Sequence, residues 1–226
     1  MSYRIKTKNK IIFDERKKAL KTLKVKITFV EEVLGTASGN PEIHKEFIAS
    51  KAPDAMSVDD EVATLGVDAV VEKSMTIVPK LEDGTPFFWD YQWKGFAKES
   101  CGMLRRVSDT KSAKLKAFKK EIDGLVFVQP RKIPIILPDG ETIGNKERPL
   151  RAETAQGARV ALANSESIPS GSTCELTWIC YVDSDIELVK EWLDYGLAHG
   201  TGQWRNAGYG RFTYEILEES DSKKIA

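Results

Sequence analysis

Histidine and cysteine are scarce in this sequence of 226 residues. The two histidines, His44 and His199, are far apart, and Cys101, Cys174 and Cys180 lack the paired spacing of metal ligands or of a disulfide framework. The chain therefore has few of the residues that a zinc site or a Ser/His/Asp triad requires, which argues against most hydrolase chemistries. We expect neither a metal nor a cofactor, and thiols kept reduced in a cytoplasm.

Long apolar runs are also missing. No stretch approaches the roughly 20 apolar residues of a membrane helix, and the first residues lack the apolar core and cleavage site of a secretory signal. The charged fraction of 30% and the aromatic fraction of 9% are those of an ordinary globular protein. We therefore expect one soluble, cytoplasmic domain over residues 1–226.

The net charge of zero hides a basic N-terminal segment. Residues 1–26 contain ten Lys and Arg against Asp14 and Glu15, so the rest of the chain is acidic. A basic arm over residues 1–21 would neutralise phosphates and release their counterions. The alternative is a solvated tail that only aids solubility.

Apolar periodicity predicts the main elements. Alternating apolar residues indicate strands over residues 23–29, 174–182 and 212–216. Apolar residues spaced three and four apart indicate helices over residues 92–105 and 184–198.

The other segments are predicted from turns and composition. Residues 75–89 look like a hairpin around an Asp-Gly turn. Residues 35–72 look like one insertion, and residues 107–150, which begin with a lysine-rich stretch, look like a second that includes a projecting β-hairpin. Residues 218–226 look like a polar tail. Without the insertions the order is strand, helix, strand, strand, helix, strand, which predicts an α+β, ferredoxin-like (RRM-like) βαββαβ core.

The segment between the second helix and the last strand has the most informative composition. It interleaves four glycines with two arginines and two aromatics. Glycines let a phosphate approach backbone amides, arginines supply charge, and aromatic rings stack on bases. The alternative is that the glycines only permit a tight connection and the tryptophan covers the core. The candidate binding residues here are Gly200, Gly202, Trp204, Arg205, Gly208, Tyr209, Gly210 and Arg211.

Residues 200–212 resemble the glycine-rich loop of the RAMP superfamily, which supplies the backbone subunits of CRISPR effector complexes. Residues 23–39 are similar to the opening segment of that family, residues 93–105 to its first helix, and residues 165–171 to the turn before its central strand. The resemblance implies a subunit that holds single-stranded RNA across its sheet and loops, beside copies of itself or other CRISPR-type subunits. It also implies a projecting hairpin, for which residues 124–150 are the candidate.

Residues 31–54 and 148–166 also resemble uncharacterised RAMP-like proteins encoded in prophages of low-GC Gram-positive bacteria. This second resemblance implies a protein that acts in the cytoplasm of a bacterial host cell, and it leaves open roles other than that of a CRISPR subunit. A viral protein of this kind would bind its own single-stranded DNA, or act as a decoy that inhibits a host CRISPR complex by protein binding.

Basic residues outside the glycine-rich segment are further candidates for phosphate contacts. Arginine suits phosphate oxygens because its guanidinium forms charge-assisted, bidentate hydrogen bonds. Any one of these residues is more simply a solvated surface position, so the hypothesis depends on their clustering. They are Lys94, Arg105, Arg131, Arg148, Arg151 and Arg159.

Some RAMP relatives cleave RNA with a histidine base or an acidic residue near the opening loop, where this chain has His44, Asp54, Asp59 and Asp60. A general base must lie within hydrogen-bond reach of the ribose hydroxyl. Because His44 follows the helix start expected at Asn40-Pro41, we expect it to be structural. The expected function is non-catalytic binding of single-stranded RNA or DNA, and a metal-independent endoribonuclease is the alternative.

Overall fold

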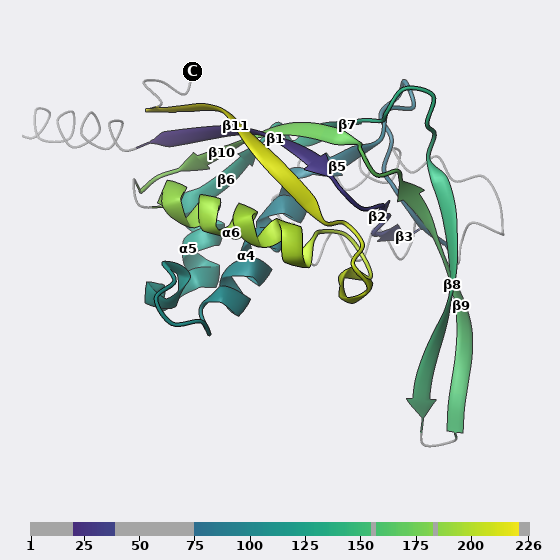
Figure 1. The fold of residues 1–226 in the computed structure, drawn as a ribbon. Helices are drawn as coiled ribbons and strands as arrows, with labels where there is room; N and C mark the ends of the chain where they lie inside the picture. The colour runs from purple at the N-terminus through teal and green to yellow at the C-terminus, as the bar shows by residue number, and fades with distance from the viewer. Residues whose placement is uncertain (1–19, 39–74, 155–156, 183–184, 222–226) are drawn as a thin grey trace, which may run out of the picture.

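The computed structural model describes residues 20–38, 75–154, 157–182 and 185–221, with the backbone alone for residues 149–162 and 221. These residues form two β-sheets and three α-helices (Figure 1). The predicted α+β class is therefore confirmed.

The main sheet is antiparallel in every strand pair that the structure describes. Its order is β11-β1-β10-β7-β5, and β6 pairs with β10 beside β7. The strands are β1 (Lys21–Phe29), β5 (Phe87–Trp89), β6 (Val126–Gln129), β7 (Lys132–Ile136), β10 (Thr173–Cys180) and β11 (Phe212–Asp221).

Alternation decides which face of the sheet is buried. In β1 every second residue from Leu23 to Phe29 is completely buried, whereas Lys24, Lys26 and Thr28 are half-exposed. Successive side chains of a strand point to opposite faces, so β1 presents one apolar face to the core. The same alternation in β10 confirms the two strands that the sequence predicted most clearly.

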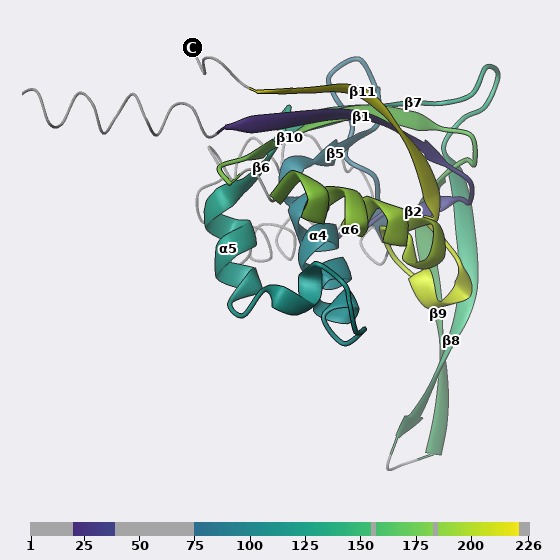
Figure 2. The same ribbon diagram turned by 60° about the vertical axis from the view of Figure 1, so that its left-hand side comes forward.

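Three helices cover the buried face: α4 (Asp90–Leu104), α5 (Phe118–Leu125) and α6 (Asp185–His199) (Figures 1 and 2). Trp93 and Trp192 are fully buried beneath α4 and α6. Burial of each large apolar side chain stabilises the fold by about 1.5–3 kcal/mol. The helices expected over residues 92–105 and 184–198 are thus confirmed within two residues at each end.

The three cysteines belong to this core. Cys101, Cys174 and Cys180 are free and buried. Desolvation raises the pKa of each thiol, that of Cys180 to about 12. The thiolate, which is the reactive form, is therefore suppressed at neutral pH.

The second sheet supports a long hairpin. Its order is β2-β9-β4-β3, with β8 paired to β9. The antiparallel register of β8 and β9 runs from Gly144 opposite Ser167 to Thr154 opposite Gly157, and the hairpin projects well away from the body (Figures 1 and 2). The strands are β2 (Val33–Leu34), β3 (Ala37–Ser38), β4 (Met75–Ile77), β8 (Gly144–Thr154) and β9 (Gly157–Ile168).

The position of this hairpin corrects the expected insertion over residues 107–150. The projecting hairpin spans residues 144–168, so it begins where the insertion was expected to end. Residues 126–136 form β6 and β7 of the main sheet, because Val128 and Ile133 are buried in its core. The part of the expected 35–72 insertion that is described, residues 35–38, contributes β3 to the second sheet.

Two other expectations need correction. The turn at Gly84 is present, with a φ of 85° and its N–H donating to the Leu81 carbonyl at 2.9 Å, but β4 and β5 on either side of it join different sheets. The polar tail expected over residues 218–226 begins as strand, since β11 pairs with β1 as far as Asp221.

Residues 1–19, which include most of the expected basic arm, lie outside the described residues, as do residues 39–74 with His44, Asp54, Asp59 and Asp60. None of the described helices is long and apolar enough to cross a bilayer.

Candidate nucleic-acid interface

The connection from α6 to β11 is built on left-handed backbone. Five of its residues have positive φ: four are Gly200, Gly202, Gly208 and Gly210, and the fifth is Trp204 at 54°. Glycine adopts this conformation without steric cost, but a bulky residue rarely does. The glycine pattern therefore encodes a tightly wound loop that holds Trp204 in an unusual conformation.

The glycines pack against the chain itself. A Cβ on Gly210 would overlap the Thr201 carbonyl, and one on Gly200 would lie 2.6 Å from the carbonyl carbon of Gly210. The N–H groups of Gly200, Gly208 and Gly210 donate to carbonyls of this chain, for example that of Gly210 to the Glu32 carbonyl at 2.8 Å. These amides shape the loop, so the expectation that they face a phosphate does not hold in this conformation.

The two aromatic residues of the loop stack on each other. The ring centroids of Trp204 and Tyr209 lie 5.2 Å apart, with 13° between the ring planes. Trp204 remains 40% exposed. Trp204 therefore lies at the surface of the loop, stacked on Tyr209, rather than in the core cluster.

Two cations from the base of the hairpin approach these rings. On β8, Arg148 places its Cζ 5.1 Å from the centroid of the Trp204 ring, and Lys146 places its Nζ 5.7 Å from that of Tyr209. Residues two apart on a strand share a face. The hairpin and the glycine-rich loop thus join two aromatic rings and two cations into one surface, the hairpin-base site: Lys146, Arg148, Trp204 and Tyr209.

Arg148 is the least solvated cation of this site, with 7% of its surface exposed. Its Nη1 donates to Ser165 Oγ and its Nη2 to Gln203 Oε1, both at 2.9 Å, while its Nε has no acceptor. Within the described part of the chain, no carboxylate lies within 4.0 Å of this guanidinium. A guanidinium does not deprotonate in proteins, and a buried charge without a counter-charge is costly. The site therefore has an unbalanced positive charge that suits an anion.

Lys146 is the second cation of the site, and Glu32 offsets its charge. Its Nζ lies 3.4 Å from Glu32 Oε2. A hydrogen bond with Tyr209 and the charge of Glu32 raise the pKa of Lys146, which stays protonated at neutral pH.

The two loop arginines have different environments. Arg205 forms an ion pair with Glu99 of α4, whose other carboxylate oxygen lies 3.2 Å from His199 Nε2. Arg205 thereby anchors the loop to α4. Arg211 is exposed and lies beside Gly208.

The other predicted cations contact different elements. Lys94 donates to the Asp123 carbonyl at 3.0 Å, and Arg105 lies over the Phe118 ring. Arg131 pairs with Asp90 at 2.7 Å. Burial raises the pKa of Asp90 despite this pairing. These contacts of Lys94, Arg105 and Arg131 are all with residues outside the hairpin-base site.

Arg151 and Arg159 lie farther out on the hairpin. Arg151 is opposite Val160 and Arg159 is opposite Ala152, with only their backbone described. Of the fourteen predicted residues, the structure thus brings together Arg148, Trp204 and Tyr209, and the glycines of the loop frame them.

Sequence reasoning missed one residue of the site, Lys146, and the two hydrogen-bond partners of Arg148, Ser165 and Gln203. Lys146 had a usable signal, since it is two residues from Arg148 in a strand-like stretch. Gln203 and Ser165 had none, because their partner Arg148 is distant in sequence.

Comparisons with known proteins place the fold. No protein-family model and no curated protein matches this sequence. A chain of the cryo-EM structure of the type III-B Cmr-beta complex bound to cognate target RNA aligns with a TM-score of 0.52 and 11% identity, over 96% of this chain and 66% of that chain. A chain of a type IV-B CRISPR complex aligns with a TM-score of 0.43 and 12% identity, over 91% of this chain and 92% of that chain.

The first of these similarities shows that this chain shares the fold of the Cmr-beta chain. This chain spans 66% of the length of that Cmr-beta chain. The likeness to prophage proteins stays a prediction.

Proposed function

We propose that this protein binds single-stranded nucleic acid without turnover, and that the hairpin-base site is the point of contact. The observation that carries the proposal is Arg148, whose nearly buried guanidinium has only neutral hydrogen-bond partners among the described residues and lies against the exposed Trp204. A phosphate would supply the missing negative charge.

The aromatic pair supplies the other half of a nucleotide site. An exposed ring takes a base by stacking, worth about 1–3 kcal/mol per base and tolerant of sequence. Bases are free to stack in this way only where the strand is unpaired. A cation for the phosphate beside a ring for the base therefore favours a single strand over a duplex.

The fold is consistent with this proposal. We propose a ferredoxin-like core, supported by the order β1, α4, β6 and β7, β10, α6 and β11 in the main sheet. A chain of similar fold belongs to a complex bound to RNA. We also propose, from the RAMP resemblance, that the protein assembles beside copies of itself or other CRISPR-type subunits along the bound strand.

The binding test uses fluorescein-labelled oligonucleotides of mixed sequence, single-stranded and duplex, with fluorescence anisotropy as the readout. We expect the wild type to prefer the single strand, and Trp204→Ala to weaken binding about tenfold or more. Trp204→Phe is the matched control, because it keeps a ring for stacking. Equal affinity for duplex, or unchanged affinity of Trp204→Ala, would contradict the proposal.

The absence of turnover is tested separately. End-labelled RNA is incubated with the wild type and with His44→Ala, and its length is followed on a denaturing gel. We expect intact RNA in both reactions. Cleavage by the wild type that His44→Ala abolishes would establish the ribonuclease instead.

A further inference from the structure

A second positively charged surface lies outside the hairpin-base site. Residues 105–120 contain seven Lys and Arg against one acidic residue, Asp109. All of these cations except the half-buried Arg105 are exposed. We define the basic ridge as Arg106, Lys111, Lys114, Lys116, Lys119 and Lys120.

The ridge belongs to the helical layer and lies away from the hairpin-base site. It follows the end of α4, includes the short 3-10 helix η3 (Ser112–Lys114) and continues into α5. In Figures 1 and 2, α5 and this connection lie at the end of the molecule opposite the β8–β9 hairpin. A ligand at the ridge would thus be distinct from one at the hairpin base.

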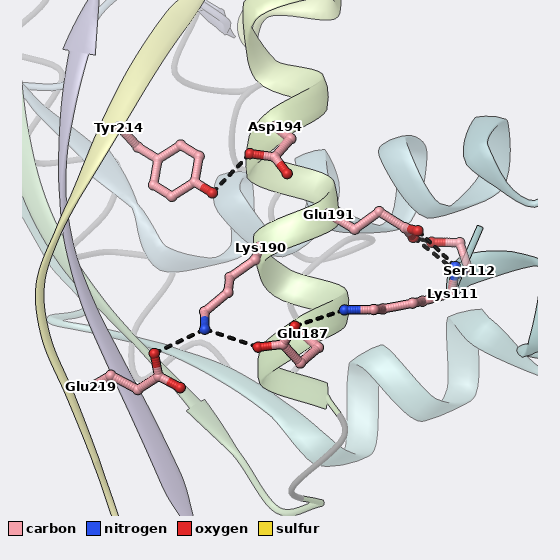
Figure 3. Close-up of polar contacts among 8 residues, drawn as sticks. All are labelled: Lys111, Ser112, Glu187, Lys190, Glu191, Asp194, Tyr214 and Glu219. Atoms are coloured by element: carbon pink, nitrogen blue, oxygen red, sulfur yellow. Dashed lines mark hydrogen bonds and ion pairs between the residues drawn. The ribbon is translucent and has the colours of Figure 1, made fainter. Parts of the chain in front are cut away.

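Contacts with α6 hold the start of the ridge in place (Figure 3). Glu191 Oε1 accepts a hydrogen bond from the backbone N–H of Lys111 at 2.6 Å, and Oε2 accepts from the N–H of Ser112 at 2.9 Å and from its Oγ at 2.5 Å. Ser112 is fully buried and also accepts from Trp192 Nε1 at 3.0 Å. The backbone at Lys111 and Ser112, where the ridge begins, is therefore tied to α6.

Most of the charge on the ridge is unbalanced. Lys111 pairs with Glu187 at 2.7 Å, but no carboxylate in the described ranges forms an ion pair with Lys114, Lys116, Lys119 or Lys120. Lys119 and Lys120 also sit in the first turn of α5 beside Glu121, where the positive end of the helix dipole favours the carboxylate and disfavours the two cations. Lys114, Lys116, Lys119 and Lys120 therefore gain no stability from ion pairs within the described residues, and Lys119 and Lys120 gain none from the dipole of α5.

We propose that the basic ridge binds the sugar-phosphate backbone of nucleic acid without regard to sequence, as a second contact separate from the hairpin-base site. Clustered cations neutralise successive phosphates and gain affinity from the release of counterions. An acidic protein is the less suitable partner, because Lys is depleted at protein interfaces. The ridge would contact a part of the bound nucleic-acid strand that the aromatic pair does not reach, or a second nucleic-acid strand beside it.

The experiment compares two quadruple variants of the full chain. In the first, Lys114, Lys116, Lys119 and Lys120 are replaced by Gln; in the second, by Arg, which keeps the charge. The affinity for a mixed-sequence single strand is measured as a function of salt. We expect the Gln variant to lose up to about 3 units of the slope of log K against log salt, at about 0.7 per phosphate contact, and the Arg variant to keep the wild-type slope. Urea midpoints equal to that of the wild type show that both variants are folded.

The outcomes separate this inference from the proposed function. A wild-type slope in the Gln variant would overturn the inference, whatever Trp204→Ala does. A reduced slope in the Gln variant together with normal binding by Trp204→Ala would support the ridge and refute the hairpin-base site. If the Gln variant keeps its slope for nucleic acid but loses affinity for polyglutamate, the ridge docks an acidic protein and the inference is wrong.

Discussion

Replacing Arg148 by Met separates binding from stability more clearly than any other single change. Met fills much of the same space and keeps an apolar contact with Trp204, but it removes the buried charge. In most proteins, loss of a well-packed buried side chain lowers stability and function together. For Arg148→Met we expect stability to stay the same or rise, while the affinity for nucleic acid falls.

The structure gives the size of the stability effect. Ser165 Oγ keeps its hydrogen bond with Thr76 Oγ1 at 2.7 Å after the substitution, and the half-buried Gln203 can turn to water. Few polar groups are therefore left unsatisfied, while an unpaired buried charge is removed. We expect the free energy of unfolding to be unchanged or to rise by up to about 2 kcal/mol.

The binding effect has the opposite sign. A charge-assisted hydrogen bond to a phosphate is worth about 1.5–3 kcal/mol. Arg148→Met should therefore weaken binding of a single strand about 10- to 150-fold.

Urea unfolding followed by circular dichroism gives the stability, and fluorescence anisotropy gives the affinity. The control is Lys98→Met, which also removes one positive charge but from a surface pair with Asp123 on α4 and α5. An Arg148→Met variant that is more than about 2 kcal/mol less stable and binds normally would show that Arg148 is a structural residue.

Three other substitutions or treatments test the rest of the account. Gly210→Ala should lower the free energy of unfolding in urea by about 3 kcal/mol, because the added Cβ would overlap the Thr201 carbonyl at a residue of positive φ. Gly140→Ala is the control: Gly140 also has positive φ but lies in open space, so the loss should be only about 1 kcal/mol. Equal losses in the two variants would contradict the tight loop. Burial and the hydrogen bond to Asp194 raise the pKa of Tyr214 to about 12 (Figure 3). The contribution of Tyr214 to stability is therefore complete below the unfolded pKa near 10 and is lost as the pH rises toward 12. Tyr214→Phe should remove this pH dependence, and a variant whose stability falls with pH in parallel with the wild type would refute the assignment. The three buried thiols should react with a thiol-specific disulfide reagent only in denaturant, whereas fast labelling of the native protein would show that the core is open.

The elements predicted correctly are those whose burial is written into local periodicity. Leu23, Val25 and Ile27 alternate with Lys and Thr, and the sequence 174–180 alternates in the same way, so both strands were evident. The helices over 90–104 and 185–199 were equally clear, because their apolar stripes face a single sheet.

The β8–β9 hairpin was placed only in part because β8 has little apolar alternation. The run from Gly144 to Thr154 is mostly polar, and it is strand because its backbone pairs with β9. The turn at Gly84 misled for a related reason: a turn sequence fixes the local reversal, but which sheet each flanking strand joins is decided by distant partners.

The candidate site was likewise predictable only where the signal is local in the sequence. Aromatic and glycine residues in 200–211 indicated a special loop, yet the burial of Arg148 depends on Trp204 and Gln203, far away in sequence. Local reasoning treats an arginine in a polar run as solvated, and only the tertiary structure shows that it is nearly enclosed.

Photo-crosslinking tests the central claim most directly. A single-stranded oligonucleotide that contains a photoreactive base is irradiated with the wild-type protein, and the attached peptide is identified by mass spectrometry. We expect the crosslink within residues 203–211, at Trp204 or Tyr209, and its loss on competition with unlabelled single strand. A crosslink confined to other segments, or none under conditions of saturated binding, would contradict the claim that the hairpin-base site holds the nucleic acid.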